Sequence, residues 1–143
     1  GSTINTPSML CIEDAIHSLK WVESIGGANT MIKRSLSNLQ VIEKWESKTN
    51  WIEFLAKNKD TRSSTSICLK IIDPWFLQLS TDSKKEILKS FFSLLEEKEA
   101  AYDINHYPSA PPGIRIWGGG TVETSNIELL LPWLDWAWEY IEK

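Results

Sequence analysis

The spacing of apolar residues changes several times along this chain, and these changes limit its fold to helices mixed with short strands. Spacing of three or four residues holds over residues 7–25 and again over residues 28–48, with a double glycine between them. This pattern predicts two helices, and the short glycine hinge predicts that they are neighbours in space. Short apolar runs at residues 51–55 and 66–72 instead predict two strands joined as a hairpin.

The second half of the chain continues the same mixture. A Ser-x-x-Glu capping box beginning at Ser83 predicts a third helix, and another beginning at Ser125 predicts a last helix rich in tryptophan. Between them, residues 101–104 and 114–117 are short strand candidates. The sequence therefore predicts an α+β fold, in which helices pack mainly on one face of a short antiparallel or mixed sheet.

Composition narrows the classes of partner. A chain of 143 residues is sufficient for one domain with a real core, and no apolar run approaches the length of a membrane span. The net charge of −4, with basic residues scattered among acidic ones, argues against a nucleic-acid surface. We therefore expect neither a membrane nor a nucleic acid as partner.

The two cysteines indicate the compartment. Cys11 and Cys68 both lie in apolar segments, and neither has the spacing to a His or a second Cys that a metal site needs. This setting favours buried free thiols over a disulfide or a metal site. Together with the lack of a signal-peptide pattern, reduced thiols favour a cytoplasmic location.

Arg115 is the best single candidate for binding a ligand. It lies between Ile114 and Ile116 in a predicted strand, so alternation places it with Trp117 on the face opposite the two isoleucines. A guanidinium presents its donors in a rigid fork that matches a carboxylate. From strand geometry alone, an ordinary surface arginine is the simpler interpretation.

Several motifs together resemble one known family. They are Ile4-Asn5-Thr6-Pro7 near the start, Trp51-Ile52-Glu53-Phe54-Leu55, Thr61-Arg62-Ser63, Asp73-Pro74-Trp75-Phe76, Pro112-Gly113-Ile114-Arg115-Ile116-Trp117 with the three glycines that follow, and Leu131-Pro132-Trp133. In this order and spacing they are similar to the C-terminal part of phosphoserine aminotransferase, a class V aminotransferase, in the version found in alphaproteobacteria. The resemblance implies that residues 3–143 are the small domain of a fold-type I enzyme dependent on pyridoxal phosphate, and that residues 1–2 are a cloning scar.

The resemblance also implies a reaction for the complete enzyme. It would interconvert phosphoserine and 2-oxoglutarate with 3-phosphohydroxypyruvate and glutamate in serine biosynthesis, as a homodimer. In this family the Schiff-base lysine belongs to the large domain, upstream of the Asn-Thr-Pro segment. The 143-residue fragment is therefore expected to be inactive and to hold no pyridoxal phosphate.

The resemblance assigns roles to individual residues. Arg115 would bind the α-carboxylate of the substrate. Asn5 and Thr6 would hydrogen-bond the cofactor phosphate of the neighbouring subunit, whereas the residues alone favour helix capping by Thr6. His106 lies in a loop where related enzymes hold the substrate phosphate, although an exposed loop histidine is the simpler interpretation. Arg62 is expected to have a structural role.

Two other functions stay open on the sequence alone. One is another class V aminotransferase, such as a serine–glyoxylate type, which would differ in what holds the side-chain phosphate. The other is a free-standing α+β binding or interaction module without catalysis. Trp133 and Trp136, three residues apart, are expected to share a helix face that contacts the large domain.

Overall fold

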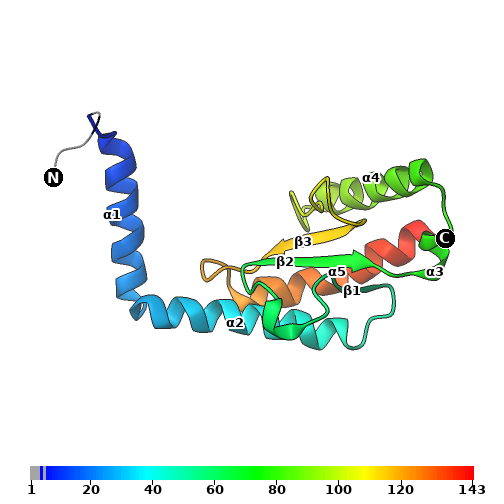
Figure 1. The fold of residues 1–143 in the computed structure, drawn as a ribbon, viewed down its shortest axis with the longest axis horizontal. Helices are drawn as coiled ribbons and strands as arrows, with labels where there is room; N and C mark the ends of the chain where they lie inside the picture. The colour runs from blue at the N-terminus through cyan, green and yellow to red at the C-terminus, as the bar shows by residue number, and fades with distance from the viewer. Residues whose placement is uncertain (1–3, 5) are drawn as a thin grey trace.

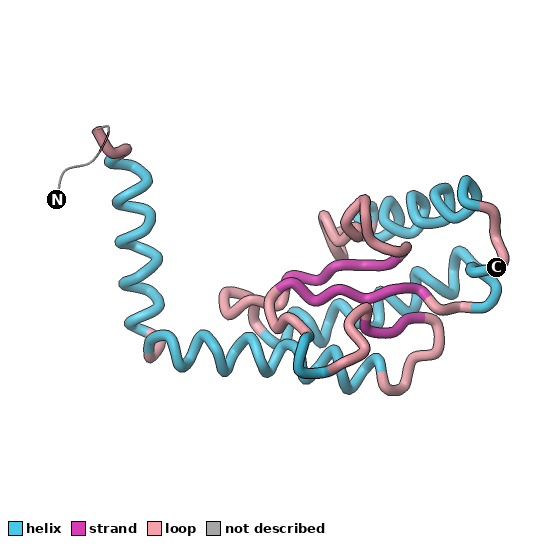
Figure 2. The backbone as a smooth tube through the Cα atoms, in the orientation of Figure 1, coloured by secondary structure: helices cyan, strands magenta, loops and turns pink. Residues whose placement is uncertain are grey.

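The chain forms a three-stranded sheet with helices before, between and after its strands (Figures 1 and 2). The computed structural model describes residue 4 and residues 6–143. The elements are α1 (Met9–Ser24), α2 (Gly27–Glu46), β1 (Ile52–Phe54), the 3-10 turn η1 (Lys59–Thr61), β2 (Ser66–Ile71), α3 (Pro74–Leu77), α4 (Thr81–Glu97), β3 (Gly113–Trp117) and α5 (Thr124–Glu142). This architecture confirms the predicted α+β class.

The sheet has the order β1-β2-β3, and both strand pairs are antiparallel. The predicted hairpin is therefore confirmed, since β1 pairs directly with β2. The strand predicted at residues 101–104 is wrong: one isolated bridge joins Asn105 to Ile114, and the N–H of Arg115 donates to the carbonyl of Ile104 at 2.8 Å. Asp103 has a left-handed backbone, with φ of 51°, which ends any extended run before it can pair further.

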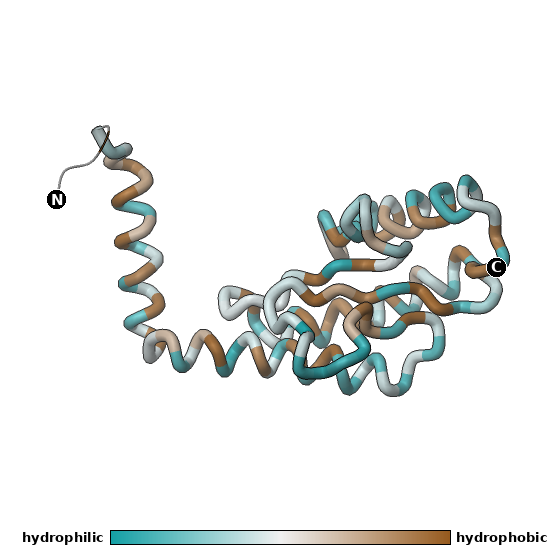
Figure 3. The backbone as a smooth tube through the Cα atoms, in the orientation of Figure 1, coloured by the Kyte–Doolittle hydropathy of each residue, from teal (hydrophilic) through white to brown (hydrophobic). Residues whose placement is uncertain are grey.

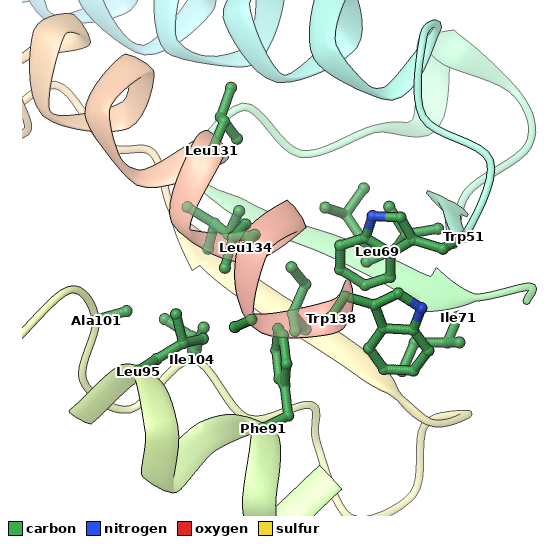
Figure 4. Close-up of a cluster of buried hydrophobic side chains, with 14 of the residues drawn as sticks. Trp51, Leu69, Ile71, Phe91, Leu95, Ala101, Ile104, Leu131, Leu134 and Trp138 are labelled. Carbon is green, nitrogen blue, oxygen red and sulfur yellow. The ribbon is translucent and has the colours of Figure 1, made fainter. Parts of the chain in front are cut away.

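The two faces of the sheet differ in polarity. Alternate residues of all three strands turn inward and are buried, namely Ile52, Phe54, Ile67, Leu69, Ile71, Ile114 and Ile116. Side chains of α4 and α5 gather over this inner face, as Phe91, Leu134 and Trp138 show in Figure 4. The outer face bears Glu53, Lys70, Cys68 and Arg115, all of them half-buried. The outer face is therefore the more polar and the more exposed face of the sheet, although it also carries the exposed Trp117.

Tryptophan 138 lies at the centre of the aromatic part of the core. Its ring is 2% exposed and stacks on Trp51 with 4.7 Å between centroids and 10° between planes. Phe76 and Phe91 meet it edge-on at 5.5 and 5.8 Å. Its indole N–H donates to the carboxylate of Asp73 at 3.0 Å, so burial leaves no polar group of this side chain unsatisfied.

Helix α1 stands away from the rest of the chain (Figure 1). It meets α2 at the turn that contains Gly26 and Gly27, whose φ values are 107° and 74°. The two helices do not pack side by side, so the prediction that they are neighbours in space is wrong. No residue of α1 is buried, although apolar residues recur along it (Figure 3). The exposed ones include Met9, Leu10 and Leu19. A lone helix with an apolar stripe normally packs that stripe against another surface.

The predicted caps and cysteine environments need correction. Helix α4 is capped by Ser80, whose hydroxyl accepts from the N–H of Ser83, and α5 has Glu123 rather than Ser125 at its N-cap. The helices therefore begin slightly earlier than the capping boxes predicted. Cys11 and Cys68 are free thiols as expected, but Cys11 is exposed and Cys68 is only half-buried, since neither α1 nor the outer sheet face is covered.

The glycine run after β3 is fastened to α2 by one buried asparagine. Asn38 is fully buried, and its side-chain amide donates to the carbonyls of Gly118 and Val122, both at 3.1 Å. Its carbonyl accepts from the hydroxyl of Thr124 at 2.7 Å. A Cβ on Gly118 would lie 2.7 Å from Cδ1 of Ile67 and 3.3 Å from the carbonyl oxygen of Ser64, so a larger residue would require these neighbours to shift. Asn38 thereby fixes the chain between β3 and α5.

We expect Asn38→Ala to lower the free energy of unfolding by about 1–3 kcal/mol, because it leaves buried carbonyls without a donor. Urea unfolding followed by circular dichroism measures the effect as a shift in midpoint. Asn29→Ala, in an exposed position on the same helix, is the matched control and should change stability far less. Equal effects of the two substitutions would show that the hydrogen bonds of Asn38 do not contribute to the free energy of unfolding.

Candidate functional site

Arg115 lies where the sequence placed it, on the outer face of the sheet. It pairs across the strands with Cys68 on β2, and Ile114 and Ile116 on either side of it are buried in the core. Because β3 is an edge strand, the side chain borders a hollow of about 470 Å³ at the free edge of the sheet, which Trp117 and the chain at residues 100–104 also line. A small ligand can therefore reach the guanidinium from solvent.

The guanidinium of Arg115 makes only long contacts. Nη1 lies 3.5 Å from the phenol oxygen of Tyr107, and Nη2 lies 3.6 Å from a carboxylate oxygen of Asp103. The ring of Tyr107 lies beneath the guanidinium, with 4.8 Å between Cζ and the ring centroid. Nε is buried and has no hydrogen-bond partner among the described residues. The fork is therefore oriented by an aromatic face, but its donors are not saturated.

The other two arginines of the chain make shorter contacts with their neighbours than Arg115 does. Arg62 donates from Nη1 to Glu43 at 2.9 Å and from Nε to the carbonyl of Ala56 at 3.2 Å, and its guanidinium lies 3.8 Å from the ring centroid of Phe54. Arg34 donates from Nε to the carbonyl of Gly120 and pairs with Glu123. The structural role predicted for Arg62 is confirmed. By contrast, Arg115 has donor capacity to offer a ligand.

His106 borders a different hollow from that of Arg115. It is half-buried and faces α4, where Lys85, Lys89 and Phe92 line a space of about 320 Å³ with it. Its Nδ1 is buried without a hydrogen-bond partner among the described residues. His106 therefore lies in a loop, as predicted, but it is only partly exposed, since the loop folds back against α4. Arg115 and His106 flank the edge of β3 without sharing one pocket.

The segment assigned to the cofactor phosphate precedes α1, which stands away from the sheet that carries Arg115. Asn5 lies outside the described residues, and Thr6 is exposed before the far end of α1 (Figure 1). Helix α1 is capped by Ser8, whose hydroxyl accepts from the N–H of Cys11 at 3.5 Å, so Thr6 is not the cap that the residues alone favoured. The structure leaves Thr6 available to a neighbouring molecule and does not bring it to the sheet.

The described residues do not assemble a pocket for pyridoxal phosphate. Such a site needs a lysine held in an enclosed environment, but the described lysines are exposed except Lys70 and Lys84. Lys70 points to the outer face, as alternation predicted, and pairs with Glu53 at 2.6 Å. Lys84 donates to the carbonyl of Leu77 at 2.9 Å. In the part of the chain that the structure describes, no group of three His, Cys, Asp or Glu side chains is arranged to hold a metal ion.

Sequence reasoning missed Asp103 and Tyr107, the two side chains that contact Arg115. Residues 101–104 were assigned to a strand, which placed Asp103 in an extended segment rather than in a turn. A signal for the turn is present: Asp is among the residues that tolerate a left-handed backbone, and the segment that follows contains Asn105, His106 and Pro108.

Comparison with curated proteins gives two close relatives. The phosphoserine aminotransferases of Methanosarcina mazei and Methanosarcina barkeri are each 46% identical to this chain over 142 residues, or 99% of it. This chain is related to the phosphoserine aminotransferases. It spans only about a third of the length of these relatives, 36% of each. No family model matches the chain.

Solved structures of phosphoserine aminotransferases share the fold. The enzyme from Bacillus circulans subsp. alkalophilus superposes with a TM-score of 0.76 over 95% of this chain and 34% of its own, at 19% identity. A phosphoserine aminotransferase from Trichomonas vaginalis, solved with pyridoxal phosphate bound, gives a TM-score of 0.68 over 93% of this chain at 16% identity. In the part of the chain that the structure describes, no helix is both long and apolar enough to cross a bilayer.

Proposed function

We propose that this chain is the small C-terminal domain, residues 3–143, of a phosphoserine aminotransferase. The complete enzyme would transfer an amino group between phosphoserine and 2-oxoglutarate, giving 3-phosphohydroxypyruvate and glutamate, in serine biosynthesis. The observation that supports this most is the 46% identity to phosphoserine aminotransferases over 99% of the chain. The two Nη groups of Arg115, which make only long contacts and border a solvent-accessible hollow, are the feature of the structure that suits such a substrate.

In this proposal Arg115 binds the α-carboxylate that all the amino-acid and oxo-acid substrates share. Two parallel N–H···O contacts fix both the position and the plane of a carboxylate. The substrate amine is thereby directed to one place, and correct orientation is itself a large part of the rate gain in reactions between two bound groups. Pyridoxal phosphate would supply the electron sink for the chemistry. This domain would contribute binding and orientation.

The remaining assignments extend the same proposal. Asn5 and Thr6 would contact the cofactor phosphate of the neighbouring subunit in a homodimer, which fits the exposed position of Thr6 away from the sheet. The role of His106 at the substrate phosphate rests on the family resemblance alone. The catalytic lysine would belong to the large domain, and the protein would be cytoplasmic.

The surface left uncovered in this chain fits a domain that packs against more protein. Helix α1 buries none of its residues, and Trp133 and Trp136 on α5 are 41% and 37% exposed. As predicted, those two rings share a face, where they meet edge-on with 5.4 Å between centroids. Because large apolar side chains are usually covered, we propose that both surfaces contact the large domain or the second subunit.

The test is a comparison of amino donors in the complete enzyme. We expect phosphoserine to exceed alanine in kcat/KM by at least roughly tenfold, because even one charge-assisted hydrogen bond to the phosphate contributes that much. The 143-residue chain alone serves as the negative control and should show no activity. A preference for alanine over phosphoserine would favour a serine–glyoxylate type of enzyme instead. No transamination by the complete protein would favour a binding or interaction module.

A further inference from the structure

The carboxylate of Asp103 occupies the side of Arg115 that a substrate carboxylate would need. Asp103 Oδ2 lies 3.6 Å from Nη2, and the phenol oxygen of Tyr107 lies 3.5 Å from Nη1. Nε is buried, so a ligand in solvent cannot reach it. The two Nη groups are therefore the donors left for a ligand, and both already face side chains of the 103–107 loop.

Two carboxylates cannot share this fork without cost. Like charges a few ångströms apart repel, and each needs the same Nη donors. An incoming carboxylate must therefore displace Asp103. That displacement is easy, because the Asp103 side chain is 89% exposed and its distance to Nη2 is that of a loose ion pair. The ring of Tyr107 lies under the guanidinium, with 4.8 Å between Cζ and the ring centroid, and can hold the guanidinium in its orientation after Asp103 has moved away.

We propose that Asp103 is a built-in competitor for the carboxylate site of Arg115, and that substrate binding requires its displacement. This inference rests on the proposed function, in which Arg115 binds the α-carboxylate. Asp103 neutralises the guanidinium in the empty site and weakens the binding of carboxylates in general. It acts through Arg115 and touches no reacting atom, so its effect is on the affinity for the substrate.

The test is Asp103→Asn in the complete enzyme. Asparagine has nearly the same shape and tolerates the left-handed backbone at this position, where φ is 51°, so the loop should keep its conformation. We expect the KM for phosphoserine and for glutamate to fall by about two- to fivefold, the size of an exposed ion pair, with kcat changed less. The inhibition constant of glutarate, a dicarboxylate without an amine, should fall by a similar factor, which reports carboxylate binding without chemistry.

Glu99→Gln is the matched control. Glu99 is an exposed acid four residues away with a similarly left-handed backbone, φ of 54°, so its substitution makes the same change in net charge without touching Arg115. It should leave both KM values and the glutarate constant unchanged. An equal effect of both substitutions would mean that general charge, and not displacement of Asp103, sets the affinity, and would overturn the proposal.

Combining Asp103→Asn with Arg115→Lys separates this inference from the proposed function. A rise in KM for Arg115→Lys supports the proposed function. If Asp103→Asn then also raises KM, or leaves it unchanged, Asp103 does not compete and only the inference fails. If Arg115→Lys itself has no effect, the role of Arg115 fails. If displacement is correct, the gain from Asp103→Asn disappears in the Arg115→Lys background, because the two changes act on one interaction.

Discussion

Replacing Trp138 with alanine should lower the free energy of unfolding of this chain by about 3–5 kcal/mol. The ring is 2% exposed and is stacked on Trp51, with Phe76 and Phe91 against its edges, so truncation opens a cavity that rigid rings cannot fill. It also removes the indole donor from Asp73. Domains of this kind are stable by only about 5–15 kcal/mol, so the loss is a large share of the total.

Urea unfolding followed by far-ultraviolet circular dichroism measures this loss without relying on tryptophan fluorescence, which the substitution itself alters. Trp133→Ala is the matched control on the same helix. Trp133 is 41% exposed and contacts Trp136 at the surface. Its replacement by alanine should therefore lower the free energy of unfolding of the isolated chain by less than about 1 kcal/mol. Similar losses from the two substitutions would contradict the central place of Trp138 in the core.

The sequence predicted most of the fold because local patterns and tertiary packing agree here. The hairpin of β1 and β2 and the alternation in β3 follow from apolar periodicity, and the inward side chains of those strands form the core. The arrangement of α1 was predicted wrongly, because a double glycine between two helices does not by itself fold them side by side. Its apolar stripe and the double glycine are visible in the sequence, but where the helix points depends on the left-handed φ values of Gly26 and Gly27 and on protein that would cover it.

The candidate site was predictable only in part. Strand alternation places Arg115 on the outer face, and the structure confirms that placement. Its partners were not predictable, because Asp103 and Tyr107 reach it from a loop whose path depends on one left-handed residue and one isolated bridge. Asn38 was missed for a related reason. A polar residue on a helix is usually solvated, and its burial here depends on the glycine run at 118–120, which lies close to α2 only in three dimensions.

If the proposed function is correct, replacing Arg115 should strongly reduce catalysis by the complete enzyme. Lysine keeps the positive charge but loses the planar fork, and each charge-assisted bond is worth about 1.5–3 kcal/mol, so kcat/KM should fall by at least roughly tenfold. Alanine removes both bonds and should lower kcat/KM by about a hundredfold or more. The value of kcat/KM should fall by a similar factor for phosphoserine and for glutamate, because both present an α-carboxylate and differ in the distal acid.

Arg62→Lys is the control for Arg115→Lys. Arg62 is also held against an aromatic ring, but it makes short hydrogen bonds to Glu43 and the carbonyl of Ala56. Its replacement should lower stability while leaving the KM for both substrates unchanged, since Arg62 does not line the hollow that Arg115 borders. Cofactor affinity should survive the substitutions of Arg115, because under the proposed function Arg115 contacts the substrate and not the cofactor. If Arg115→Ala left the kinetics with both amino acids intact, Arg115 would be an ordinary strand arginine, and the hollow at the edge of β3 would not be the carboxylate site.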